Sequence, residues 1–416
     1  MTLALLPSDY IVWVLFFLFV IALFWIRTQP HYRAQWKQVF QKKIAMIAFV
    51  ILGVFAIIGL LDSIHIQIMQ HHLPQQKSIL DLVLSLLNTQ DEKTYTAPFA
   101  VALHPTPPHD IILRSMKGFL FGALSYAIVA GIWIYICRHK KNKLAIAWRE
   151  AMMTIGIIWI LICVLTMLAQ NYHIFGTNKI GQDMFYETIK SVRTGLLIGT
   201  LTTLFMLPFA LFFGTIAGYF GGFIDDVIQY LYTTLSSIPG VLLITAMILV
   251  MQVVISNHPA LFPTIADRAD ARLLTLCFIL GITSWASLCR LLRAETLKLR
   301  EQDFVLAAIA MGAKKIPIII RHILPNVMHI ILITIVLDFS GLVLAEAVLS
   351  YVGVGVDPTT ASWGNMINTS RLELAREPIV WWPLCAALVM MFFLVLSANL
   401  FSDAVRDAFD PRAGKT

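Results

Sequence analysis

Long apolar runs separated by short polar segments dominate the chain. A helix that crosses a membrane needs about 20 mostly apolar residues, and nine runs meet that requirement. The predicted spans cover residues 7–26, 44–61, 118–137, 151–169, 195–217, 239–257, 273–292, 327–349 and 379–400. The pattern therefore predicts an all-α membrane protein, a polytopic helical bundle.

The composition agrees with this pattern. Apolar residues make up 58% of the 416 residues and charged residues only 13%, against about 45–50% and about 25% in soluble proteins. The net charge of +7 falls in short clusters between the apolar runs, so it indicates membrane topology rather than binding of nucleic acid. The five cysteines lie in apolar runs without C-x-x-C spacing, and neither a disulfide framework nor a zinc site is expected.

Basic residues indicate the orientation, because Lys and Arg accumulate on the cytoplasmic side. One alternating set of loops contains 20 of the 31 Lys and Arg residues, which leaves 11 for the other set. We therefore expect the N-terminus outside and the C-terminus in the cytoplasm. The cytoplasmic loop around 221–232 contributes nothing to this argument, because it contains Asp225 and Asp226 and no basic residue. The first apolar run, Leu5–Ile26, is too long for a signal-peptide core and is expected to be retained.

The long outer segment 62–117 is rich in histidine. It contains His65, His71, His72, His104 and His109, and a His-rich stretch can bind metal. No pair has H-x-x-x-H spacing, so a solvated outer loop without metal is expected.

The most informative segment, Asp303–Gly312 continuing to Ile320–Asn326, follows the seventh span. Ala307, Ala308 and Ala310 predict a short helix with a small-residue face that another protein's backbone can approach closely, and Gly312 permits a left-handed turn at its end. Pro325 marks entry to the next membrane helix, with His322 at the membrane interface.

This order of residues resembles the cytoplasmic signature loop of the inner-membrane permeases of binding-protein-dependent ATP-driven (ABC) importers. In that family the loop is the coupling helix, which seats in a cleft of the ATPase subunit. The resemblance implies a coupling loop over 293–326 that includes Asp303, Leu306, Ala307, Ala308, Gly312, His322 and Pro325. Leu306 stands where the family signature often has Glu, a departure common in the peptide-type branch.

Further segments are similar to the C-type subunit of the dipeptide and oligopeptide (peptide/nickel) permeases. Phe175–Asp183 looks like that branch's Leu-Gly-Thr-Asp-x-x-Gly-Arg-Asp box, with Asn178 and Gln182 as departures. Ala217–Gly222 with Asp225, Tyr351–Pro358 with Ser362–Gly364, and the tail Ala404–Pro411 are similar to its turns and ending. The resemblance covers about residues 170–411 and gives outer loop or gate candidates: Gly176, Thr177, Asp183, Gly353, Gly355, Pro358, Trp363 and Gly364.

Glycine spacing in the fifth span predicts close helix contact. Gly195 and Gly199, and again Gly214 and Gly218, form G-x-x-x-G pairs, which place both glycines of a pair on one helix face. Packing within the chain and a subunit interface both remain open. Trp363 is interpreted as an interfacial anchor in preference to part of a gate.

The first 150 residues precede the resembling region. We expect residues 1–150 to form extra transmembrane helices and residues 151–416 to form the six-helix permease core. In the alternative, the core's first helix is 44–61 and the hairpin 118–169 is an insertion in its outer loop. Topology alone does not choose, because inserting a hairpin leaves every later orientation unchanged.

Several familiar signatures are missing from the sequence. It contains no G-x-x-x-x-G-K-[ST] loop for phosphate, no G-x-S-x-G and no H-E-x-x-H. No cofactor, metal or enzymatic activity is therefore expected, and energy must come from a partner. Asp338 in the eighth span is an intramembrane acid, which is a functional candidate by default; it either lines the solute path or bonds to a neighbouring helix.

These observations predict a transmembrane permease subunit of an ATP-driven importer that works by alternating access. The resemblance implies four partners, namely a second homologous permease subunit, two ATPase subunits that bind and hydrolyse ATP, and an outer solute-binding protein. Localisation in the bacterial inner membrane among lipid is expected. Peptides are the favoured solute, with nickel complexes or antimicrobial peptides as alternatives. An ion-coupled secondary transporter requires charged or broken helices in matched repeats, and a membrane enzyme requires a nucleophile or metal constellation; neither pattern is found.

Overall fold

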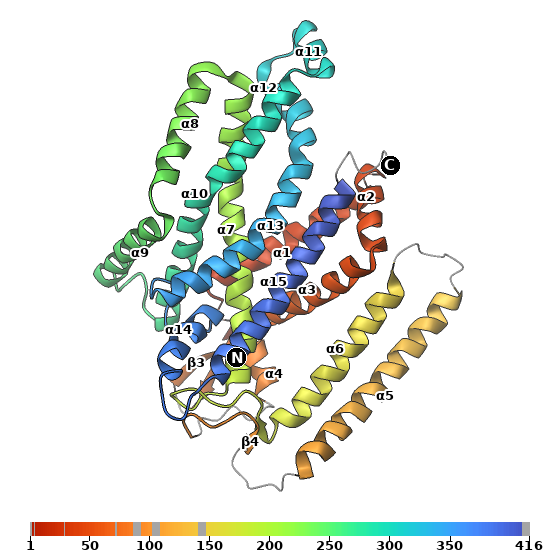
Figure 1. The fold of residues 1–416 in the computed structure, drawn as a ribbon, viewed down its shortest axis with the longest axis vertical. Helices are drawn as coiled ribbons and strands as arrows, with labels where there is room; N and C mark the ends of the chain where they lie inside the picture. The colour runs from red at the N-terminus through yellow and green to blue at the C-terminus, as the bar shows by residue number, and fades with distance from the viewer. Residues whose placement is uncertain are drawn as a thin grey trace. The chain divides into compact units, whose positions relative to one another are not determined.

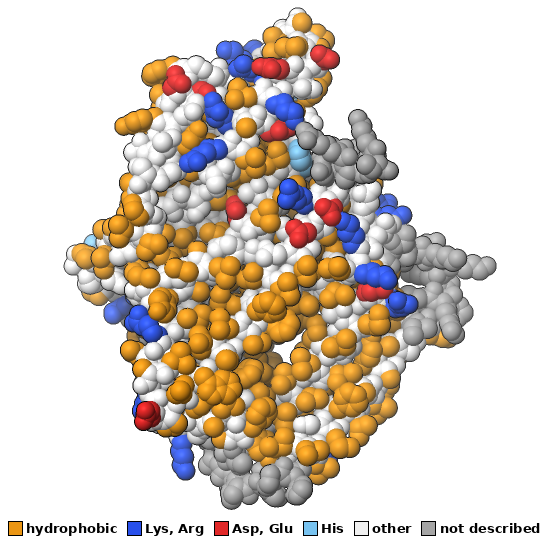
Figure 2. Space-filling model, in the orientation of Figure 1, with side chains coloured by type: hydrophobic (Ala, Val, Ile, Leu, Met, Phe, Trp, Pro, Cys, Tyr) orange, Lys and Arg blue, Asp and Glu red, His pale blue; other side chains and the backbone are white. Residues whose placement is uncertain are grey.

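The computed structural model describes residues 2–3, 5–28, 30–70, 73–85, 93–101, 109–139 and 147–409. Within these ranges nine helices are long and apolar enough to cross a membrane, and each coincides with one of the predicted spans. The predicted all-α, polytopic membrane fold is therefore confirmed. Apolar side chains cover much of the visible surface (Figure 2), as expected for helices that face lipid.

The chain divides into two compact units. The first contains residues 1–196 and 358–408, and the second contains residues 197–357 and 409–416. Helix α7 (Met184–Phe220) begins in the first unit and continues into the second. The predicted domains, 1–150 and 151–416, concern which helices form the transport core, which compactness alone does not decide, so they stay predictions.

The first unit combines membrane helices with short strands and short helices. Besides the start of α7, its helices are α1 (Pro7–Thr28), α2 (Pro30–Gln41), α3 (Lys43–Asp62), α4 (Ile79–Leu84), α5 (His109–His139), α6 (Trp148–Ala169), α14 (Trp363–Glu373) and α15 (Trp382–Phe409). Strands β1 (Thr2–Leu3), β2 (His65–Gln70) and β3 (Leu73–Ser78) form an antiparallel sheet in that order, and β4 (Ala100–Val101) pairs antiparallel with β5 (Tyr172–His173).

Helices α5 and α6 form a closely packed hairpin (Figure 1). A Cβ at Gly118 of α5 would lie 2.9 Å from Cα of Val164, and one at Gly122 would lie 3.0 Å from Cα of Ile160. This G-x-x-x-G pair, which the sequence analysis did not single out, lets the two backbones approach. Beyond α5, helix α6 packs chiefly on α3.

Helix α3 contacts segments that lie far along the chain. A Cβ at Gly59 would lie 2.8 Å from Cδ1 of Leu196 in α7. The ring of Phe55 meets Trp363 edge-on with centroids 6.4 Å apart. Lys42, directly before α3, forms a 2.6 Å ion pair with Asp407 near the end of α15. Helix α3 therefore packs among the helices of the resembling region.

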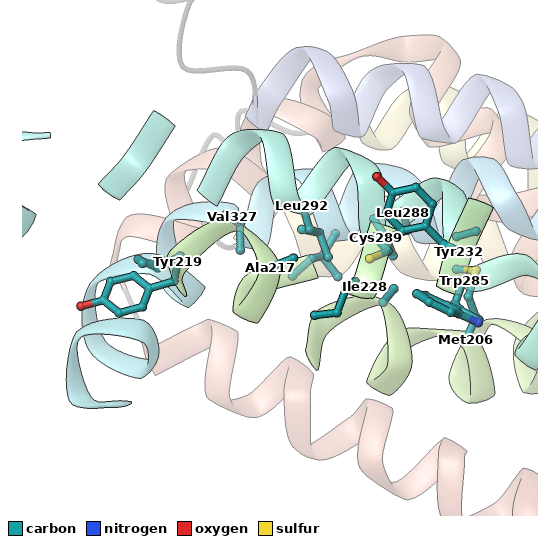
Figure 3. Packing of buried hydrophobic residues seen from close by; sticks show 14 of the residues in the cluster. Met206, Ala217, Tyr219, Ile228, Tyr232, Trp285, Leu288, Cys289, Leu292 and Val327 are labelled. Carbon is teal, nitrogen blue, oxygen red and sulfur yellow. The ribbon is translucent and has the colours of Figure 1, made fainter. Parts of the chain in front are cut away.

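The second unit consists of the rest of α7 with α8 (Gly222–Ser237), α9 (Gly240–Asn257), α10 (Ile265–Arg300), α11 (Asp303–Ala310), α12 (Lys315–Ile318), the π-helix η1 (Ile319–Ile323) and α13 (Leu324–Tyr351). Its core contains Met206 and Ala217 of α7, Ile228 of α8, Leu292 of α10 and Val327 of α13 (Figure 3). Lipid is as apolar as these side chains, so close packing rather than exclusion of water stabilises their contacts.

The prediction of a loop around 221–232 is wrong, because most of this segment belongs to helix α8. Gly221 and Gly222 make the turn with positive φ (66° and 55°), and the helix then buries Asp225, Ile228 and Tyr232. These three residues follow a helical spacing of three and four. The same spacing is present in the sequence.

Candidate functional site

Helix α11 follows α10 after only two residues. The Gln302 carbonyl accepts hydrogen bonds from the backbone nitrogens of Val305 and Leu306, both at 3.0 Å, and so starts the helix. Val305 and Ala308 are buried against the core of the second unit, whereas Leu306 and Ala307 face outward. The expectation that Ala308 is presented to a partner is therefore wrong, since only 4% of it is exposed.

Gly312 ends α11 as the sequence predicts. Its φ is +78°, its nitrogen donates to the Ile309 carbonyl at 2.9 Å, and the nitrogen of Ala313 donates to the Ala308 carbonyl at 3.1 Å. These two bonds form a Schellman motif, which needs a left-handed residue at this position. The predicted left-handed turn is confirmed. A Cβ at Gly312 would meet nothing within 4 Å.

Helix α11 and the turn after it expose a set of large apolar side chains. Met311 is 82% exposed and Leu306 50%, and Phe304 and Ile309 are also exposed. Lys314, Lys315 and Asp303 border them and are exposed too, and charged side chains gather over this end of the second unit (Figure 2). An apolar patch with a charged rim at a membrane protein's polar end is typical of a protein-binding surface.

A π-helical turn connects this surface to the membrane helix. His322 lies in η1, where its ring is 6.3 Å from that of Phe304, and its carbonyl accepts a 2.6 Å hydrogen bond from Nδ2 of Asn326. Pro325 lies in the first turn of α13, which confirms it as the entry to the next span. The pattern of residues gave no sign of the π-turn, and π-turns are frequent at functional sites.

Helices α8 and α10 are joined by a bidentate ion pair that the sequence analysis missed. Nε and Nη2 of Arg293 donate to the two carboxylate oxygens of Asp225 at 2.5 and 2.6 Å, and Nε2 of Gln229 donates to Asp225 at 3.1 Å. The Arg293 hydrogen bonds hold the pKa of Asp225 below its ordinary value, against the opposing effect of burial. Asp225 was noted only as part of a turn, and nothing in the sequence identified Arg293 as its partner.

The loop before α7 is closed by its own hydrogen bonds. Asp183 Oδ1 accepts from the backbone nitrogens of Phe185 (2.7 Å) and Tyr186 (3.2 Å), which caps α7, while Oδ2 lies 2.7 Å from Nδ1 of the buried His173. The Thr177 hydroxyl donates to the Lys93 carbonyl at 2.8 Å. We call residues 172–183 the outer loop, after the side of the membrane that the sequence predicts for it; its predicted gate residues Thr177 and Asp183 are brought together here.

Gly176 lies in the same loop with φ at +67°. A Cβ there would overlap the Thr96 carbonyl oxygen and lie 2.9 Å from Nε1 of Trp382. The two departures from the family box also meet, since Nδ2 of Asn178 donates to Oε1 of Gln182 at 3.2 Å. A neutral amide pair therefore occupies the place of the acid and base that the family box has at these positions.

Trp363 does not face the membrane interface. The side chain is 2% exposed, its Nε1 donates to the Thr188 carbonyl at 3.0 Å, and its ring lies against Gly195. The interpretation as an interfacial anchor is therefore wrong, because an anchor must reach the lipid headgroups. Gly364 is buried beside it, and its nitrogen donates to the Ser362 hydroxyl at 3.0 Å.

Gly353 lies just after the end of a helix with a positive φ, as Gly312 does. With φ at +86°, it ends α13, and its nitrogen donates to the Ser350 carbonyl at 2.9 Å. A Cβ at Gly355 would overlap the Ser350 hydroxyl. Pro358, by contrast, is exposed. The outer candidates are thus mainly residues that fold the chain tightly.

The four glycines of α7 all pack within the chain. A Cβ would lie 2.9 Å from Trp363 at Gly195, 2.5 Å from the Phe339 ring at Gly199, 2.8 Å from Cβ of Leu292 at Gly214 and 2.7 Å from the Arg293 carbonyl at Gly218. Of the two possibilities left open by the sequence, these contacts support packing within the chain.

Asp338 lies on α13 beside a hollow of about 160 Å³. The hollow is lined by Met206, Ser284, Ser287, Leu337, Asp338, Gly341 and Leu342. Oδ2 of Asp338 is buried and has no hydrogen-bond partner. Within the described part of the chain, this acid therefore does not use that oxygen to bond to a neighbouring helix.

Of the five histidines in segment 62–117, the structure describes the side chain of His65 alone. His65 is described and lies 2.8 Å, through Nδ1, from the buried Asp9, which also binds Arg193 of α7 at 2.6 Å. His71, His72 and His104 lie outside the described residues, as does the side chain of His109. Among the residues searched, no group of His, Cys, Asp or Glu has the makings of a metal site.

Comparison with known proteins gives consistent matches. Residues 210–415 match the family described as binding-protein-dependent transport system inner membrane component. The chain is 30% identical over 243 residues to the dipeptide transport system permease protein DppC of Lactococcus lactis subsp. cremoris, which covers 58% of this chain and 65% of that protein. It is 30% identical to the oligopeptide transport system permease protein OppC of Bacillus subtilis (58% and 73% covered) and 31% identical to OppC of Mycobacterium tuberculosis (58% and 76% covered).

Proposed function

This chain belongs to the family of binding-protein-dependent transport system inner membrane components, and we propose that it is the membrane-spanning subunit of an ATP-driven importer of di- or oligopeptides. In this proposal it pairs with a second permease subunit, and two ATPase subunits and an outer solute-binding protein complete the importer. The relatives named as dipeptide and oligopeptide permeases support the choice of solute.

The observation that carries the proposal is the exposed apolar surface of α11. Leu306, Ala307, Ile309 and Met311 face away from the core, while Val305 and Ala308 fix the helix to it. Covering an exposed apolar side chain such as Met311 with another protein is energetically favourable. We infer that this surface seats in the ATPase subunit, so that closure of the ATPases moves α11 and drives alternating access.

We further propose that α3 is the first helix of the permease core and that the α5–α6 hairpin is an insertion in its outer loop. The contacts of Gly59 with α7, Phe55 with Trp363 and Lys42 with Asp407 support a core position for α3. Helix α6 reaches the core helices of the first unit chiefly through α3. The core then contains α3, α7, the α8–α9 pair, α10, α12–α13 and α15.

The orientation follows the basic residues. The loops that contain Lys42, Arg293, Lys315 and Arg406 belong to the more basic set, so we assign α11 and the end of α15 to the cytoplasm and the outer loop to the opposite side. This orientation brings α11 to the compartment in which ATP is available. It also places the chain's start outside.

The proposal is tested by purifying a tagged chain from its native membranes in mild detergent. We expect an ATPase and a second permease to copurify, and we expect Ala307→Cys to crosslink to a cysteine placed on that ATPase. Ala308→Cys is the matched control, because its side chain is buried and it should crosslink far less. A chain that purifies alone and moves solute into liposomes without ATP would contradict the proposal.

A further inference from the structure

The hollow beside Asp338 is lined by polar as well as apolar side chains. Two serines of α10, Ser284 and Ser287, face it together with the carboxylate, and the remaining lining comes from Met206, Leu337, Gly341 and Leu342. Among these seven residues no Lys, Arg or His is present to neutralise the acid. A carboxylate inside a membrane is costly unless something pairs with it.

Each polar side chain at the hollow has an oxygen that can accept hydrogen bonds. Within the described residues, Oδ2 of Asp338 has no hydrogen-bond partner. The Ser287 hydroxyl donates to the Ser284 carbonyl at 3.3 Å, which leaves its oxygen lone pairs available. A carboxylate and two hydroxyl oxygens match the donors of an ammonium or guanidinium group, which has several N–H bonds and no acceptor.

The hollow is also large enough and reachable. Its volume of about 160 Å³ is several times the roughly 30 Å³ that one water molecule occupies in the liquid. Ser287 and Leu337 are exposed, so the hollow opens at the surface of the second unit. A Cβ at Gly341 would meet nothing within 4 Å, which leaves that side of the hollow open.

We propose that Asp338, Ser284 and Ser287 form a subsite for a positively charged amine or guanidinium group of the peptide in transit. This inference rests on the proposed function, because the ligand is the cargo of the importer. The charged group comes either from the peptide's amino terminus or from a basic side chain. Both present the same chemistry to the carboxylate, and the experiment separates them.

The test measures uptake of three radiolabelled peptides by the complete importer in membrane vesicles. The peptides are Ala-Ala-Ala, N-acetyl-Ala-Ala-Ala and N-acetyl-Ala-Lys-Ala. We expect Asp338→Asn to lower uptake of the peptides that contain an amine by about tenfold, because hydrogen bonds to charged groups are strong. Uptake of N-acetyl-Ala-Ala-Ala should stay close to wild type. The solute-binding protein is unchanged, so the variant-to-wild-type ratio isolates the permease.

The two amine sources are separated by which peptide loses uptake. A loss confined to Ala-Ala-Ala assigns the subsite to the amino terminus, and a loss confined to N-acetyl-Ala-Lys-Ala assigns it to the basic side chain. Equal effects on all three peptides, or no effect on any, would overturn the proposal. A wild-type importer that carries none of the three would overturn the proposed function, and the subsite with it.

Two further variants keep the test decisive if Asp338→Asn fails to assemble. The double variant Ser284→Ala with Ser287→Ala removes acceptors with little change in volume and must show the same selectivity among the peptides. Gly341→Leu fills the hollow and should lower uptake of all three, while Gly53→Leu on α3 is its matched control, because Gly53 also has open space. Equal uptake in these two glycine variants would contradict the role of the hollow.

Discussion

The outer loop and the α11 segment each contain a glycine in the left-handed region, yet their surroundings differ. Gly176 lies against the Thr96 carbonyl and the Trp382 ring, whereas Gly312 has open space around it. Around Gly176 the polar groups Thr177 and Asp183 are paired within the chain, and beside Gly312 the side chain of Met311 is exposed. The polar groups of the outer loop are thus paired within the chain, whereas the α11 segment leaves large apolar side chains uncovered.

The largest difference in stability is expected when each of the two glycines is replaced by alanine. Gly176→Ala adds a backbone overlap to left-handed strain and should lower the free energy of unfolding by about 3 kcal/mol or more. Gly312→Ala suffers only the strain of a left-handed alanine, about 1 kcal/mol. Thermal unfolding of the two variants in detergent measures the difference, and equal shifts would show that the surroundings do not matter.

Removing the Asp183 side chain tests whether the outer loop is stabilised by its own polar groups. Asp183→Ala removes the cap of α7 and the partner of buried His173, and we expect a loss of about 2 kcal/mol. Gln182→Ala, which removes only the exposed partner of Asn178, should cost clearly less. Chemical or thermal unfolding of both variants measures the two losses, and an undiminished stability of Asp183→Ala would contradict the assignment.

Glu373 of α14 gives a pH-dependent test in the same outer region. Both of its carboxylate oxygens are buried, with no hydrogen bond from any residue that the structure describes. Burial raises its pKa, while Lys179 and Arg376 oppose that rise. The folded state therefore binds the proton more tightly than the unfolded state, so its contribution to stability is present at low pH and is lost as the pH rises through the folded-state pKa.

Glu373→Gln should remove this pH dependence. At pH 8 we expect the variant to be more stable than the wild type by about 1 kcal/mol, the order of magnitude of an unpaired buried polar group. At pH 4 the two proteins should be nearly equal. Melting temperatures measured between pH 4 and pH 8 test the sign, and a variant that gains more at pH 4 would refute it.

The smallest effect on stability is expected in the α11 segment. Leu306→Lys replaces an exposed side chain, so the unfolding free energy should change by less than about 0.5 kcal/mol, while copurification of the ATPase and uptake of peptide should be lost. Ile180→Lys in the outer loop is the matched control, because Ile180 is also an exposed apolar residue. Loss of the ATPase in both variants, or in neither, would remove the distinction between the two regions.

Much of the fold could be predicted because membrane spans depend on length and hydropathy. The nine runs are all helices, and Gly312 and Pro325 mark the ends they predict. What the sequence could not supply was orientation around a helix axis. Ala307 and Ala308 are the same residue type, so the sequence does not show which of them faces the core. In the structure Ala308 does, on the same side of the helix as the buried Val305.

Contacts between distant segments were the other part that the sequence could not supply. Trp363 is typical of an interface by residue type, but Gly195 and the Thr188 carbonyl create a buried place for it. The pairing of Asp225 with Arg293 joins positions 68 residues apart. The position of α3 depends on Leu196, Trp363 and Asp407, which no local pattern connects to it.

The close approach of α7 to α10 has a mechanical consequence. At Gly214 and Gly218 the space for a side chain is already taken by the carbonyls of Cys289 and Arg293, so no flexible side chain separates the two backbones that could absorb a displacement by changing rotamer. The joint is stiff. Because α11 begins two residues after α10 ends, we expect a displacement of α11 to move α10 and, through this contact, α7.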